Sequence, residues 1–132
     1  MSNFLRALPI ILQSEGGYVN HPADPGGATN QGVTQRVYDA WRSNGGQQKR
    51  SVREITPEEV EAIYREQYWD QAKCDKMPWP LSLMHFDAAV NHGVTRANKL
   101  LQKALGVTAD GVIGNVTLAA IRQNPPKATD VQ

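Results

Sequence analysis

Apolar residues recur along most of this chain at the three- and four-residue spacing of helices, and no segment shows a sustained alternation of apolar and polar residues. Phe4, Leu8 and Ile11 follow this spacing, which predicts a helix over residues 3–15. Pro9 should weaken one turn of that helix. Because strands would need a period of two, the pattern predicts an all-α fold.

Five further helices are predicted. Thr34 suits the N-cap of one, and Thr56-Pro57 followed by Glu59 forms the start signal of another, with a capping box. Pro78, Pro80 and several glycines separate the later segments. The expected ranges are about 35–42, 57–70, 81–92, 95–105 and 115–123.

The first helix leads into a long glycine- and proline-rich loop, within "SEGGYVNHPADPGGATNQGVT". Glu15 stands at the helix end, directly before Gly16 and Gly17, and Asp24 follows nine residues later. A carboxylate partly removed from water suits a general acid, and glycoside hydrolysis generally uses a second carboxylate or a positioned water. On residues alone, Glu15 can equally be a polar residue at a helix end, and Asp24 a hydrogen-bonding partner of the following turn.

The same stretch resembles the signature of glycoside hydrolase family 108, a family of bacterial and phage-associated N-acetylmuramidases with a lysozyme-like helical fold. The similar residues are "EGGY" (15–18), "PADPGGATN" (22–30) and "GVT" (32–34), and "YREQYWD" (64–70) and "FDAAVNHG" (86–93) extend the resemblance over nearly the whole chain. The resemblance implies a lysozyme-like helical domain with a long active-site loop. It also implies a lysozyme that cleaves bacterial peptidoglycan without a cofactor.

By this resemblance, Glu15 is the catalytic acid. Phage lysozymes also place an aspartate nine residues after their glutamate, as Asp24 stands here, and a threonine soon after. Thr29 lies one residue short of that spacing, and His21 replaces a residue that is commonly acidic in the family. Asp24 would orient the attacking water and Thr29 would hold it. A lytic transglycosylase using Glu15, or a non-catalytic peptidoglycan-binding protein, are the alternatives.

Aromatic and amide side chains are the candidates for sugar contacts, because the CH faces of a glycan pack on rings. Tyr18 and Asn30 follow the acid in the loop. Tyr68 stands on a predicted helix at a spacing more typical of core residues, and a structural hydrogen bond would explain Asn91 equally well.

The chain is predicted to hold a lysozyme-like catalytic region, 1–78, and a peptidoglycan-binding region, 79–132, packed as one compact domain. "LLQKALGVTADGVIGNVTLAAI" (100–121) resembles the binding module that accompanies the family. Family members usually continue with another helix where this chain ends in the polar "NPPKATDVQ", which indicates either a short variant or a truncated form. Apolar surface exposed by a missing helix would favour a homodimer.

The net charge of +1, with acids and bases mixed, gives no stripe for nucleic acid, and the basic run Lys49, Arg50 and Arg53 is expected to be a solvated loop. No apolar run approaches the roughly 18 residues that span a membrane. We expect a protein made in the cytoplasm without a signal peptide, which acts on the wall after release or export, as a phage or prophage endolysin does. Cys74 is expected to be a packing residue. His85 and His92 lack a third ligand, so no metal site is predicted.

Overall fold

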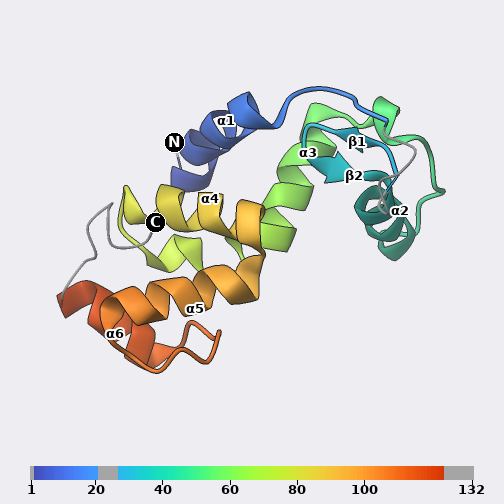
Figure 1. Ribbon diagram of the computed structural model, residues 1–132. Helices are drawn as coiled ribbons and strands as arrows, with labels where there is room; N and C mark the ends of the chain where they lie inside the picture. The colour runs from blue at the N-terminus through green and yellow to red at the C-terminus, as the bar shows by residue number, and fades with distance from the viewer. Residues whose placement is uncertain (1, 21–26, 124–132) are drawn as a thin grey trace. The chain divides into compact units, whose positions relative to one another are not determined.

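The computed structural model describes residues 2–20 and 27–123. Six α-helices form most of this part of the chain, together with one hairpin of two short strands (Figure 1). The α-helices are α1 (Asn3–Glu15), α2 (Gln35–Asn44), α3 (Pro57–Tyr64), α4 (Leu81–His92), α5 (Val94–Leu105) and α6 (Asn115–Gln123). The strands are β1 (Thr29–Asn30) and β2 (Val33–Thr34), and three short helical segments are η1 (Val52–Glu54), η2 (Arg65–Trp69) and η3 (Cys74–Lys76).

The mostly helical fold is confirmed, and so are the predicted helix starts. The Thr34 hydroxyl accepts a hydrogen bond from the Val37 amide at 3.1 Å, which caps α2. At the start of α3, the Glu59 amide donates to Thr56 Oγ1 at 3.2 Å, and the Thr56 amide donates to Glu59 Oε1 at 3.1 Å. These two bonds are the reciprocal pair of a capping box.

Two local predictions differ from the structure. The predicted glycine- and proline-rich loop between the first two helices contains β1 and β2. The predicted α-helix over 57–70 ends at Tyr64, after which η2 is a π-helical turn closed by the Asp70 amide on the Arg65 carbonyl at 2.8 Å. A hydrogen bond over five residues lets one extra residue enter the turn, and a pattern of apolar spacing does not reveal it.

The chain divides into two compact units. The first, here called the N-terminal unit, is Leu8–Ile63 and holds β1, β2, α2, η1 and most of α1 and α3. The second, the C-terminal unit, comprises Met1–Ala7 with Tyr64–Gln132 and holds α4, α5 and α6. The functional boundary between residues 78 and 79 stays a prediction.

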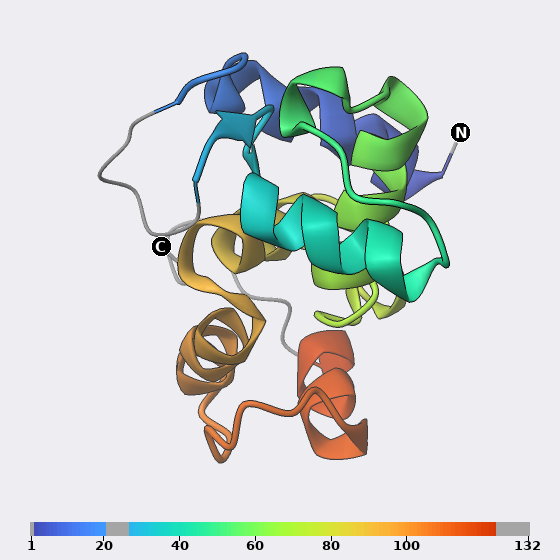
Figure 2. The same ribbon diagram turned by 90° about the vertical axis from the view of Figure 1, so that its right-hand side faces the viewer.

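The C-terminal unit has an aromatic core in which Phe4, Trp69 and Phe86 are fully buried. Their ring centroids lie 5.2 to 5.9 Å apart, within the range of favourable edge and tilted contacts. A second cluster of buried apolar residues lies among α4, α5 and α6. Helix α4 packs on α5, and α5 packs on α6 (Figure 2). Its buried members are Met77, Leu81, Leu101, Ile113 and Ile121. No helix among the described residues is long and apolar enough to cross a membrane.

Candidate active site

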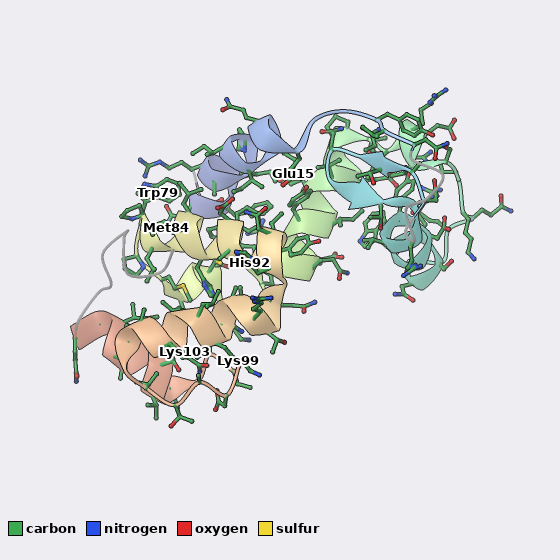
Figure 3. The ribbon with its side chains drawn as sticks, viewed as in Figure 1. Glu15, Trp79, Met84, His92, Lys99 and Lys103 are labelled. Atoms are coloured by element: carbon green, nitrogen blue, oxygen red, sulfur yellow. The ribbon has the colours of Figure 1, made fainter. Side chains whose placement is uncertain are left out.

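Glu15 is the last residue of α1 and lies in the N-terminal unit (Figure 3). Leu8 and Ile11, which precede it at helical spacing, are buried, whereas Glu15 is partly exposed. Glu15 therefore lies on the same side of α1 as these buried residues, at the end of the helix, where that side becomes accessible to solvent.

The backbone after Glu15 leaves open space. Gly16 has φ +73°, a conformation that glycine adopts without the strain of a side chain, and it ends the helix. Among the atoms of residues 2–20 and 27–123, none lies within 4 Å of a Cβ added at Gly16 or at Gly17. Glu15 thus combines a partly exposed side chain with following glycines that no other described residue crowds.

The chain returns to this region at β1. The Val19 amide donates to the Thr29 carbonyl at 2.7 Å, and the Thr29 amide donates to the Val19 carbonyl at 2.7 Å. β1 also pairs with β2 in antiparallel register, with Thr29 opposite Thr34. Thr29 is thereby paired with Val19, which follows Glu15 by four residues in the sequence. Asp24 and His21 lie outside the described residues.

Tyr18 precedes the bridged residue Val19, and its side chain is half-buried. The Arg53 guanidinium carbon lies 4.4 Å from the centroid of the Tyr18 ring, a cation–π arrangement. Arg53 covers one face of the ring, so any sugar stacked on Tyr18 must use the other face.

The Asn30 side chain forms hydrogen bonds within the fold, apart from any contact with substrate. Its side-chain nitrogen donates to the Val52 carbonyl at 3.1 Å and to the Arg53 carbonyl at 3.3 Å. These bonds tie η1 to β1, and they position Arg53 over Tyr18. The contact of Asn30 with sugar stays a prediction.

Gln35, the first residue of α2, reinforces the same link, and no motif pointed to it. Its side-chain nitrogen donates to the Arg50 carbonyl at 2.8 Å, and its side-chain oxygen accepts from the Val52 amide at 2.7 Å. Its own amide donates to the Ala28 carbonyl at 2.8 Å. One side chain thus holds segment 50–52 against the start of α2.

A network of charged side chains centres on Glu59. Its carboxylate accepts from the Tyr38 hydroxyl at 2.7 Å, from Arg42 Nη1 at 2.8 Å and from Arg50 Nη2 at 2.7 Å. Burial opposes the charge of Glu59, but these bonds and the one from the Thr56 amide outweigh it and hold the pKa at about 2.

The prediction of a solvated basic run was therefore wrong for Arg50, which pairs with Glu59 and also donates to the Tyr38 hydroxyl at 2.7 Å. Its partners come from two helices on either side of it in the sequence, α2 and α3. Local composition does not reveal pairing at that separation.

Tyr68 and Asn91 belong to the C-terminal unit. The Tyr68 ring is half-buried and lies 5.6 Å from the Tyr64 ring, measured between centroids. Asn91 is exposed on α4, and its side-chain nitrogen donates to Asp87 Oδ1 at 3.1 Å. Of the predicted site residues that the structure describes, the N-terminal unit thus contains Glu15, Tyr18, Thr29 and Asn30.

Histidine and cysteine form no metal-binding group in the described ranges, where no cluster of three or more His, Cys, Asp or Glu side chains occurs. His85 is buried and shares a 2.8 Å hydrogen bond with Asn98 Oδ1, while His92 is exposed. Cys74 is fully buried, as expected for a packing residue, and burial raises the pKa of its thiol.

The sequence matches the model of the family described as Glycosyl hydrolase 108 over residues 8–93, about two-thirds of the chain. The chain belongs to the glycosyl hydrolase 108 family. It is a glycoside hydrolase by this membership, and the matched range holds the described candidates from Glu15 to Asn91.

A solved structure of SagA from Brucella abortus is similar to this glycosyl hydrolase 108 member, with a TM-score of 0.80 and 42% sequence identity. The similarity covers 98% of this chain and 72% of the SagA chain. It therefore extends beyond residue 93 into α5 and α6. No match was found among curated proteins.

Proposed function

We propose that this glycoside hydrolase is an N-acetylmuramidase, which hydrolyses the β-1,4 bond between N-acetylmuramic acid and N-acetylglucosamine in bacterial peptidoglycan. The observation that carries the proposal is the position of Glu15. It is the last residue of α1, it is partly exposed, and no other described residue crowds the two glycines after it. The family match includes this position.

In the proposed reaction, Glu15 protonates the glycosidic oxygen as the bond breaks. Asp24 orients the attacking water and stabilises the positive charge that develops on the sugar. Thr29 helps to hold that water, and its backbone pairs with Val19, four residues after the end of α1. Tyr18, Asn30, Tyr68 and Asn91 contact the sugars.

The proposal also covers the rest of the chain. Residues 79–132 serve as a peptidoglycan-binding region, and the protein reaches the wall after release or export, in the manner of a phage or prophage endolysin. Its partner is the glycan strand, and neither nucleic acid nor a membrane-inserted state takes part.

Release of dye from labelled, purified peptidoglycan tests the assignment of Glu15. Glu15→Gln keeps the size of the side chain and removes its acidity, so we expect the rate to fall by about 10²- to 10⁴-fold. Asp24→Asn should also lower the rate. Glu58→Gln is the matched control, because Glu58 is an exposed carboxylate in the first turn of α3, and it should leave the rate unchanged.

Circular dichroism and thermal unfolding of each variant establish that the fold is retained. A folded Glu15→Gln variant that keeps more than about a tenth of the wild-type rate would be incompatible with Glu15 as the general acid.

A further inference from the structure

One face of α5 is strongly basic. The helix carries Arg96, Lys99 and Lys103 and has no acidic residue. Spacings of three and four residues align these side chains along one side of a helix, and all three are exposed. Figure 3 shows Lys99 and Lys103 on the same side of α5. The three residues are called the basic face below.

The rest of α5 fixes which side faces solvent. Ala97 and Leu101 are buried, and so are Asn98 and Gln102, whose side chains form hydrogen bonds. Asn98 Nδ2 donates to the Gly111 carbonyl at 3.0 Å, and Gln102 Nε2 donates to the Val112 carbonyl at 2.8 Å. Because rotation of the helix would break these bonds, the side of α5 that carries the basic face stays at the surface, where the end of the Lys99 side chain lies beside Gly111.

The basic face has no anionic partner among residues 2–20 and 27–123. Both ion pairs found there go to Glu59, in the other unit. The nearest acid along the following turn is Asp110, and its Oδ1 accepts from Gln102 Nε2 at 2.9 Å and from the Val112 amide at 3.0 Å. These bonds direct the carboxylate into the turn.

Helix stability explains only part of this charge. A cation near the C-terminal end, such as Lys103, is favoured by the helix dipole, but Arg96 stands in the first turn, where the dipole disfavours a positive charge. The helix dipole therefore does not account for Arg96.

Charge is also divided unequally between the two units. The C-terminal unit has nine Lys and Arg against six Asp and Glu, a formal charge of +3. The N-terminal unit has five against seven, a formal charge of −2. A polyanion would therefore be attracted to the C-terminal unit and repelled by the unit that contains Glu15.

We propose that the basic face binds a linear, phosphate-bearing polymer lying along α5. Arg96 and Lys103 are separated by about 10 Å along the helix axis, at 1.5 Å per residue, which suits successive charges of one extended chain. No aromatic residue occurs in α5 on which a base could stack, so the site suits a phosphate polymer without bases better than a single-stranded nucleic acid. This inference goes beyond the proposed function and does not depend on which bond Glu15 cleaves.

Fluorescence anisotropy with labelled inorganic polyphosphate tests the proposal on the full chain. Each contact between a cation of the protein and a phosphate releases roughly 0.7 of a counterion from the polymer. Three such contacts predict a slope of about −2 when the logarithm of the affinity is plotted against the logarithm of the salt concentration. A variant combining Arg96→Gln, Lys99→Gln and Lys103→Gln should lose at least about tenfold in affinity and most of this slope.

A matched control combines Lys49→Gln, Lys73→Gln and Lys76→Gln, three exposed lysines outside α5 that give the same change in net charge. Its affinity for polyphosphate should stay within about threefold of the wild-type affinity. The affinity of Glu15→Gln should also stay within this range, so that a failure of the proposed hydrolase activity can be told apart from a failure of this proposal. Equal losses in the control and the α5 variant, or no loss in either, would overturn the proposal. Vesicles containing anionic lipid, or single-stranded DNA, bound more tightly than polyphosphate would overturn the choice of partner.

Discussion

Glu59→Gln tests whether one carboxylate organises the N-terminal unit. The side chain of Glu59 is 11% exposed, and it receives hydrogen bonds from Tyr38, Arg42 and Arg50. The pKa of the carboxyl group is about 2 rather than its ordinary 4.5, because these bonds outweigh the opposing effect of burial. At about 1.4 kcal/mol per pKa unit, the difference corresponds to roughly 3 kcal/mol of stability as an upper figure.

The direction of the pH dependence follows from the lowered pKa. The folded state binds a proton at Glu59 less readily than the unfolded state, so this stabilisation is complete above pH 4.5 and is lost as the pH falls through about 2. Glutamine at this position still accepts from the Thr56 amide but has no charge to offer the two arginines. We therefore expect the variant's free energy of unfolding to be lower by about 2–3 kcal/mol at pH 7.

Urea unfolding followed by circular dichroism, from pH 7 to pH 3, measures this difference directly. The gap between wild type and Glu59→Gln should narrow steadily below pH 4.5. Glu58→Gln makes the same charge change on an exposed neighbour and should differ from wild type by less than about 0.5 kcal/mol. A gap that stays constant over this pH range, or an equal loss in Glu58→Gln, would refute the reasoning.

Three further predictions concern the C-terminal unit. Gly111→Ala should lower the free energy of unfolding by about 1–3 kcal/mol, because Gly111 has φ +83° and a Cβ there would lie 3.0 Å from Thr95 Cγ2. In the same urea titration, Gly114→Ala should lower it by less than about 1 kcal/mol, because a Cβ there meets open space. Burial lowers the pKa of His85, so stability should fall as the pH drops below 6.5, and His85→Gln should remove that part of the dependence in unfolding curves between pH 7 and 5. Cys74 should react with a thiol reagent at least about 100-fold more slowly in the folded protein than in urea, because its thiol is buried and its pKa raised.

The helices and their starts were predictable because local signals determine them. Thr34 and the pair Thr56 and Glu59 have cap chemistry that acts within three residues, and the structure shows those bonds. The position of Glu15 at the end of α1 follows in the same way from the apolar spacing before it and the glycines after it.

The hairpin and the polar networks were not predictable, because each depends on contacts between distant segments. Strands of two residues, such as β1, are too short to show alternation. Asn30 and Gln35 resemble ordinary loop and helix residues until the structure places η1 beside them. Arg50 shows the same limit, since its carboxylate partner is nine residues away in the sequence.

Mass spectrometry of the soluble fragments released from purified peptidoglycan tests the central claim most directly. Wild type and Glu15→Gln are compared under identical conditions, and the reducing ends of the fragments are identified. The proposed muramidase predicts hydrated N-acetylmuramic acid at the reducing end, released by wild type and absent with Glu15→Gln. Anhydro ends would contradict hydrolysis and indicate a transglycosylase, and the absence of fragments from wild type would contradict the proposed activity altogether.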